Sequence, residues 1–157
     1  MSLPIREQAL AALAARLAII RTTAGYHFNL GLYVSRVQRF HAETGSPTVS
    51  VWDGRETAAA QHRGILLTLP VSVQASVPYT AASDAAYLIA DIYKCLATWA
   101  ITHETVPGFR DTVIERLEYA GAEPLYPESG SSVLSVRSDW NLSIAVRRGD
   151  PYTSIQP

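Results

Sequence analysis

Two long stretches of the chain alternate between apolar and polar residues, and this alternation constrains the fold more than any other feature. From position 65 to position 77 every odd position is apolar, whereas the even positions are mostly polar. From position 134 to position 146 the apolar residues again share one parity, and Ser138 is the single polar residue on that face. Such alternation is typical of antiparallel strands with one buried face. Because Pro70 has no amide proton, we expect the first strand to lie at an edge there or to carry a bulge.

Two other segments have apolar residues at helical spacing. The first extends from Pro4 to about Thr22, and Gly25 is a suitable end for it. The second extends from about Ser83 to His103, with Asp84 in its first turn. Their apolar stripes consist of Leu10, Leu13, Leu17 and Ile20 in the first segment and Leu88, Ile92, Leu96 and Trp99 in the second.

The remaining segments carry weaker signals. Residues 32–41 alternate imperfectly, and residues 48–52 indicate a short strand that ends at the turn Asp53-Gly54. We interpret residues 55–62 as a polar, alanine-rich connection, and residues 111–126 as a short helix followed by a strand. The sequence therefore predicts an α+β fold, in which two main helices pack on one face of a mostly antiparallel, twisted sheet of about five strands.

The length of 157 residues fits one domain, residues 1–157. Residues 147–157 lack core residues, so we expect an extended C-terminal tail that becomes ordered only against a partner. The first twenty residues include charges at Arg6, Glu7 and Arg16, which excludes an uninterrupted apolar signal-peptide core. No window approaches the roughly 18 apolar residues of a membrane span, so we expect a soluble protein in a reducing compartment.

Charge and composition argue against several function classes. Thirteen basic and fourteen acidic residues give a formal charge of −1, so no broad positive field favours nucleic-acid backbones. The single cysteine, Cys95, excludes an intrachain disulfide and a multi-thiolate zinc site. Eight tyrosines outnumber the other aromatic residues, and tyrosine is enriched at protein interfaces, although it also borders cores.

No arrangement of residues in the sequence predicts catalysis. The four histidines are widely spaced, and no glycine-rich phosphate loop or nucleophile elbow is present. Cys95 and His103 would lie about 12 Å apart along one helix, too far for a thiolate–imidazole pair. We therefore predict no catalytic, metal-binding or cofactor-binding residue, no cofactor and no enzymatic activity.

The layout of the chain resembles the tail terminator, or tail completion, proteins of long, non-contractile-tailed bacteriophages. The likeness covers nearly the whole chain and lies in its layout and in short patches rather than in one diagnostic motif. The matching pieces are the amphipathic start from Ile5 through Leu17, Gly25-Tyr26, the segment PTVSVWDGRE at 47–56, the strand from Arg63, the second helix and Gly149-Asp150-Pro151-Tyr152.

The resemblance implies a structural virion protein that caps the tail tube as a homohexameric ring. Such a ring ends tube polymerisation and offers a joining surface for the head-side connector. The implied partners are other copies of the chain, the tail tube protein and a head–tail connector or stopper protein. Neither a membrane nor sequence-specific nucleic acid is implied, although DNA would pass through the ring. The implied location is the tail or neck of the virion, after assembly in the host cytoplasm.

Two polar segments are the predicted working surfaces of such a ring. The first, 53–63, is expected on the tube-facing side or in the lumen, and the second is the tail from position 147. Their candidate tube or subunit contacts are Asp53, Arg55, Glu56, His62, Arg63, Arg147, Arg148, Asp150 and Tyr152. Three alternatives stay open: another head–tail neck or connector component, a small enzyme, and a regulatory or host-interaction domain.

Overall fold

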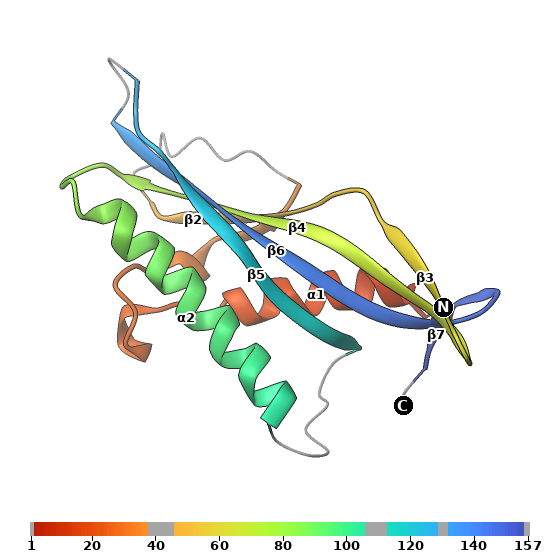
Figure 1. Ribbon diagram of the computed structural model, residues 1–157. Helices are drawn as coiled ribbons and strands as arrows, with labels where there is room; N and C mark the ends of the chain where they lie inside the picture. The colour runs from red at the N-terminus through yellow and green to blue at the C-terminus, as the bar shows by residue number, and fades with distance from the viewer. Residues whose placement is uncertain (1, 38–45, 106–112, 129–131, 156–157) are drawn as a thin grey trace.

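The computed structural model describes residues 2–37, 46–105, 113–128 and 132–155, with the backbone alone for 101–105. Two helices, α1 (Ile5–Leu17) and α2 (Asp84–Thr105), lie on one face of a seven-stranded sheet (Figure 1). This arrangement confirms the predicted α+β class. The strands are β1 (Val34–Arg36), β2 (Thr48–Asp53), β3 (Thr57–Gln61), β4 (Gly64–Pro78), β5 (Ile114–Leu125), β6 (Val133–Arg147) and β7 (Asp150–Ser154).

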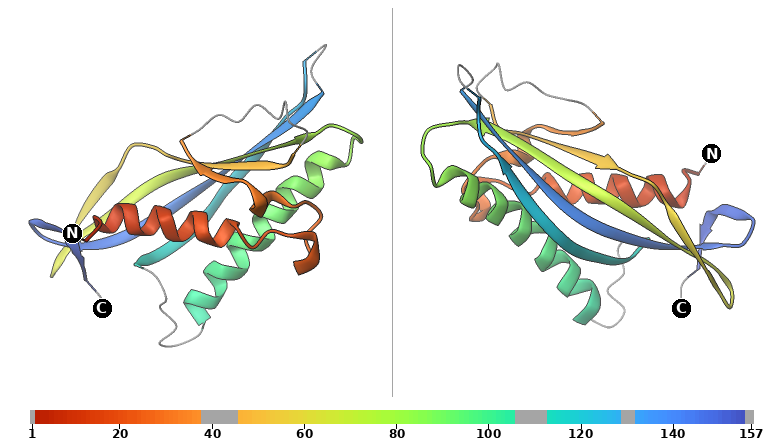
Figure 2. Two further views of the ribbon diagram at one scale, coloured as in Figure 1. Left: turned by 180° about the vertical axis from the view of Figure 1, so that it is seen from behind. Right: turned by 45° about the horizontal axis from the view of Figure 1, so that its top comes forward.

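The sheet is antiparallel at every junction except one. The strand order is β1-β2-β4-β6-β5, while β3 also pairs with β4 and β7 pairs with β6. The exception is β1, which runs parallel to β2. Figure 2 shows the twisted sheet from two further sides, with both helices on the same face of it.

The centre of the sheet is the long ladder between β4 and β6. It runs without a register shift from Gly64 opposite Arg147 to Pro78 opposite Val133. This register places the odd positions of β4 and the even positions of β6 on one face, as their apolar patterns require. The polar exception, Ser138, is fully buried there and accepts a hydrogen bond of 2.9 Å from the indole nitrogen of Trp140. A buried indole N–H requires such a partner, which explains the serine.

The helices bury their apolar stripes against this face in one continuous core. The buried residues of α1 are Ile5, Ala9, Leu10, Leu13 and Leu17, and those of α2 include Leu88, Ile92, Cys95, Leu96 and Trp99. The start of α2 is fixed by the Asp84 carboxylate, which accepts bonds from the amides of Thr80 and Ala81. The backbone amide of Ala81 is the main reason why the pKa of Asp84 lies below its ordinary value.

The first helix is shorter than the sequence predicts. It ends at Leu17 rather than near Thr22, because the chain turns there and the amide of Ile20 bonds to the Leu17 carbonyl. The amide of Gly31 then bonds to the carbonyl of Ile20 at 2.8 Å. A Cβ at Gly31 would lie 2.2 Å from the carbonyl oxygen of Ala18, so this close approach requires glycine.

Pro70 lies in an interior strand, not at an edge. On one side β4 pairs with β6 along its whole length, and on the other it pairs first with β3 and then with β2. Pro70 lies where β3 gives way to β2, and its carbonyl accepts a bond of 2.8 Å from the amide of Gly54. The expectation of an edge strand is therefore wrong. The missing amide falls where the neighbouring ladder is already interrupted.

Three segments differ from their sequence-based interpretation. Residues 57–61, expected to form part of a polar connection, are the strand β3. The strand expected at 32–41 has only three described strand residues, in β1, and 38–41 lie outside the described residues. The strand β5 begins at Ile114, so no helix precedes it within the described part of the 111–126 segment.

Candidate functional site

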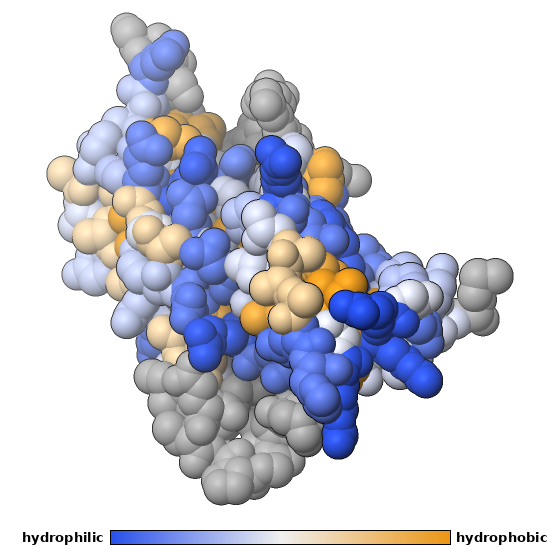
Figure 3. Space-filling model, turned by 45° about the vertical axis from the view of Figure 1, so that its right-hand side comes forward, coloured by the Kyte–Doolittle hydropathy of each residue, from blue (hydrophilic) through white to orange (hydrophobic). Residues whose placement is uncertain are grey.

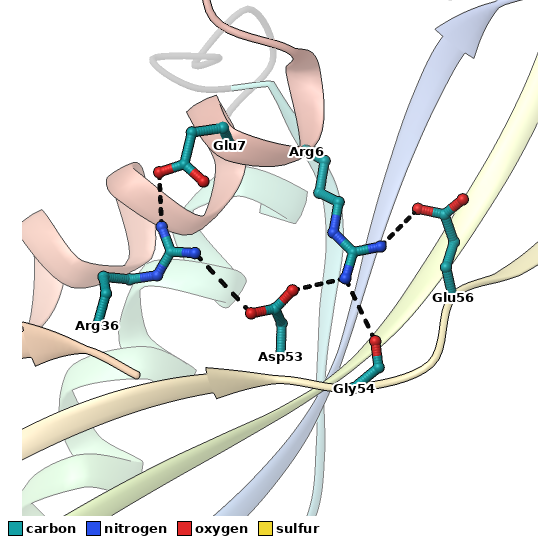
Figure 4. Close-up of polar contacts among 6 residues, drawn as sticks. All are labelled: Arg6, Glu7, Arg36, Asp53, Gly54 and Glu56. Carbon is teal, nitrogen blue, oxygen red and sulfur yellow. Dashed lines mark hydrogen bonds and ion pairs between the residues drawn. The ribbon is translucent and has the colours of Figure 1, made fainter. Parts of the chain in front are cut away.

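An ion-pair network joins the start of α1 to the end of β2 (Figure 4). Arg6 donates to Asp53 at 2.5 Å, to Glu56 at 2.9 Å and to the carbonyl of Gly54 at 3.3 Å. Beside it, Arg36 in β1 donates to Glu7 at 2.7 Å and lies 3.9 Å from Asp53. The hydrogen bond to Asp53 is the main reason why the pKa of Arg6 is raised above its ordinary value.

This network accounts for two of the predicted interface residues. Asp53 has only 18% of its side chain exposed, and both of its oxygens face arginines of the same chain. Glu56 is also engaged, through Arg6. Arg55 lies between them in sequence but is exposed. Asp53 and Glu56 therefore hold α1 against β2, whereas Arg55 is accessible to a partner.

The other predicted interface residues gather at one end of the sheet, which we call the distal end. It consists of the β3–β4 turn, with His62 and Arg63, and the β6–β7 turn, with Arg147 and Arg148, and all four residues are exposed. The β4–β6 register brings the two turns together, since Gly64 lies opposite Arg147. Figure 3 brings this side forward and shows strongly hydrophilic residues bordering a small apolar patch.

The C-terminal segment folds back onto its own chain at the distal end. The strand β7 pairs with β6, and the amide of Ile155 bonds to the carbonyl of Ala145 at 3.1 Å. Asp150 accepts bonds from the hydroxyl of Thr153 and the amide of Tyr152, and the Thr153 bond is the main cause of its lowered pKa. The expectation that this segment orders only against a partner is therefore wrong for residues 150–155, although Tyr152 remains 47% exposed.

Two edge strands on opposite sides of the sheet, β3 and β5, differ in chemistry. All five residues of β3 are exposed and uncharged, and the pairing of β3 with β4 has no register shift. In contrast, β5 carries exposed charges at Arg116, Glu118 and Glu123, and it has register shifts between Ile114 and Arg116 and between Tyr119 and Gly121.

Exposed tyrosines border the core beside β5 and along α2. Tyr119 of β5 and Tyr93 of α2 meet edge to face, with ring centroids 4.9 Å apart. Tyr119 also packs 5.0 Å from the buried ring of Trp140. At the start of α2, Tyr87 stacks on His27 at 4.1 Å. These tyrosines therefore extend the core to the surface, and each leaves more than 40% of its area exposed.

The buried polar groups of the helix layer serve the fold. Cys95 is fully buried between the helices, and its thiol lies 3.4 Å from the carbonyl of Arg16. Burial is the main reason why the pKa of Cys95 rises from its ordinary value of 9.0 to about 11. Asp91 is also buried, and it accepts bonds from the amides of His27 and Phe28. Cys95 is thus a buried, protonated thiol at neutral pH, and Asp91 holds the backbone at His27 and Phe28 against α2.

Within the described part of the chain, no cluster of three or more histidine, cysteine or acidic side chains could hold a metal ion. None of the described helices is long and apolar enough to cross a membrane.

The sequence matches no known family, and no curated protein is similar in sequence. The fold, however, is similar to that of a chain in the solved structure of the virion of a native gene transfer agent particle. The two chains are 13% identical and superpose with a TM-score of 0.53. The match covers 90% of this chain and 98% of the other, so the shared fold extends over nearly the whole of both.

Proposed function

We propose that this protein is a structural component of a phage-like virion, and specifically a tail terminator that caps the tail tube as a homohexameric ring. The observation that carries the proposal is the shared fold with a chain of a gene transfer agent virion, because it includes 98% of that chain. The resemblance in layout to tail terminator proteins supports the finer assignment. In this role the chain acts as one domain and catalyses no reaction.

The shape of the sheet fits a subunit that contacts its neighbours on two sides. Its edge strands β3 and β5 lie on opposite sides of the β4–β6 ladder. When each copy contacts the next through two different surfaces, the same contact repeats along the assembly. The assembly closes into a ring when the rotation from one copy to the next divides evenly into a full turn. Two-sided contact of this kind is what a cap on a tubular assembly requires.

We assign the distal end to the contact with the tail tube. Its two turns hold the exposed residues His62, Arg63, Arg147 and Arg148, with Asp150 and Tyr152 beside them. Arginine forms bidentate bonds with carboxylates, so the expected surface on the tube carries acidic residues. The opposite end of the ring then receives the head–tail connector or stopper protein.

The first experiment is native mass spectrometry of the purified chain over a concentration series. We expect a discrete hexamer without a series of larger species. A stable dimer that grows no further would contradict the ring.

The second experiment measures capping directly. Labelled protein is mixed with preformed tail tubes of the same virus, and its position is recorded by electron microscopy. We expect the label at one end of each tube, and the variant Arg147→Glu/Arg148→Glu is expected to lose this binding. Binding to the portal-side connector but not to tubes would instead identify the chain as another neck component.

A further inference from the structure

The outer side of β3 is an open strand edge. Antiparallel pairing uses the backbone groups of alternate residues, so those of the other residues point away from β4. None of the backbone bonds described for the chain reaches that outer side. Soluble proteins normally protect such an edge with charges, proline or bulges, and β3, with the sequence TAAAQ, has none of these. An unprotected edge of this kind is suited to pairing with another strand.

The charges beside β3 and along β5 have opposite signs. Arg55 precedes β3 and Arg63 follows it, and both are exposed. The one acidic residue beside them, Glu56, is already paired with Arg6. On β5, the three acidic residues Glu115, Glu118 and Glu123 outnumber the one basic residue, Arg116, which pairs with Glu118 at 3.3 Å, so the strand keeps a net charge of −2. The basic flanks of β3 are thus complementary to the acidic edge of β5, which selects a second copy of this chain as the partner.

The directions of the two edge strands also fit each other. β3 is antiparallel to β4, β4 to β6, and β6 to β5, so β3 and β5 run in opposite directions. In a ring whose copies share one orientation, β3 of one copy and β5 of the next would meet antiparallel. Antiparallel pairs are slightly more stable per residue than parallel pairs.

We propose that β3 of each copy pairs backbone to backbone with the stretch Arg116–Tyr119 of β5 in the next copy. The sheet then continues from one copy to the next, and its closure into a ring rests on the function proposed above. That stretch of β5 lies between the two register shifts and pairs regularly with β6, from Arg116 opposite Ser143 to Tyr119 opposite Trp140. The three central residues of β3 are alanines, which do not favour one alignment with a partner strand over another. The register shifts and charges of β5 therefore determine which residues of the two strands pair.

The test uses two variants that each give the two edges like charges. Arg55→Glu/Arg63→Glu makes the flanks of β3 acidic, and Glu118→Arg/Glu123→Arg makes the β5 edge basic. Each variant alone is expected to need at least about tenfold more protein for half-assembly, because like charges then meet across every contact. The matched control is Arg147→Glu/Arg148→Glu, which reverses two charges at the distal end and should assemble as the wild type does.

Mixing the two variants gives the sharpest result. In an alternating assembly every contact joins unlike charges, so an equimolar mixture should regain wild-type assembly. Native mass spectrometry should then show equal numbers of the two chains, and therefore only even-numbered rings. A pairing of β3 with β3 would instead stop at dimers of one copy of each variant, because a contact between identical surfaces closes on itself.

The proposal is overturned if either variant assembles like the wild type, if the folded variants fail to assemble when mixed, or if the wild type never self-associates. Circular dichroism and the melting temperature establish that the variants are folded. Rings that form despite the charge changes would overturn the β3–β5 contact and leave the terminator function standing. Assembly through these edges into dimers or open fibres would overturn the terminator function instead.

Discussion

The helix-covered middle of the sheet and its β3 edge are both formed by antiparallel pairing, but they differ in which groups the pairing buries. In the middle, β4 and β6 bury alternate side chains under α1 and α2, and the buried polar residue Ser138 bonds within the chain. At the β3 edge five residues are held by one ladder, and all of their side chains are exposed. The free energy of folding is thus concentrated in the middle, while the edge is available to a partner.

This difference predicts that substitutions separate into two groups. Changes in the helix-covered middle should lower stability, with little specific effect on assembly in molecules that stay folded. Changes at the β3 edge should leave stability unchanged and weaken assembly of the ring, whereas changes at the distal turn of Arg147 and Arg148 should leave both unchanged and weaken binding to the tail tube. The predictions below concern losses of stability, in order of decreasing effect, and pair the largest of them with a matched change at the distal end.

The largest effect is expected for Trp140→Ala in the middle of the sheet. Trp140 is buried, packs 5.0 Å from the ring of Tyr119 and donates to Ser138, so the change leaves a cavity and an unpaired hydroxyl. We expect the free energy of unfolding to fall by about 4 kcal/mol, measured by urea denaturation.

The matched change at the distal end is Tyr152→Ala, since that side chain is 47% exposed. It should alter the free energy of unfolding by less than about 0.5 kcal/mol. Similar losses of stability in Trp140→Ala and Tyr152→Ala would contradict the contrast between the two regions, because they would mean that the distal end contributes to the core.

A smaller effect is expected from raising the pH, through Cys95 in the helix layer. Burial raises the pKa of its thiol to about 11 in the folded chain from 9.0, so the folded state keeps a proton that the unfolded state loses. The stabilisation is complete below pH 9 and is lost as the pH rises to 11. Each pH unit in that window corresponds to about 1.4 kcal/mol, which gives a total of about 2 to 3 kcal/mol.

The Cys95→Ala variant isolates this effect, because other groups also titrate in the same window. We expect the stability of the wild type relative to the variant to decline between pH 9 and pH 11. A difference that stays constant over this range would show that the thiol titrates normally and that water reaches the helix layer.

The sequence predicted the middle of the molecule well and the edges poorly, for a physical reason. In β4 and β6 burial on one face imposes the alternation of apolar and polar residues, so the pattern reports the strand directly. In β3 neither face is covered, and alanine has little preference for strands, so nothing in residues 57–61 distinguished a strand from a connection. Residues 57–61 form a strand because their backbone pairs with β4, and this is a tertiary interaction that the local sequence does not encode.

The candidate surfaces show the same limit. The residues at both distal turns were predicted as interface candidates, but as members of two separate segments. The β4–β6 ladder unites them by placing Gly64 opposite Arg147. The ion pairs of Asp53 could not be predicted, because Arg6 is 47 residues away in sequence and no local pattern connects them.

A loss smaller than that at Trp140 or Cys95 is expected at the boundary between the two regions, where Arg6 joins α1 to the segment that leads into β3. Its partners Asp53 and Glu56 are partly exposed, and such pairs contribute up to about 1 kcal/mol. We expect Arg6→Ala to lower the free energy of unfolding by about 1 kcal/mol, and by less in high salt, where these charges are screened.

A double-mutant cycle with Asp53→Asn tests whether the loss comes from that pair. The coupling energy should account for most of the effect, because Asp53 is less exposed than Glu56 and its bond to Arg6 is the shorter of the two. The same Arg6→Ala variant should also assemble less well than Arg147→Glu/Arg148→Glu, since freeing Glu56 places an unpaired acidic group beside β3. Normal assembly of Arg6→Ala would show that the position of β3 does not depend on the ion pairs with α1. The independent edge region would then begin directly after β2, at Gly54.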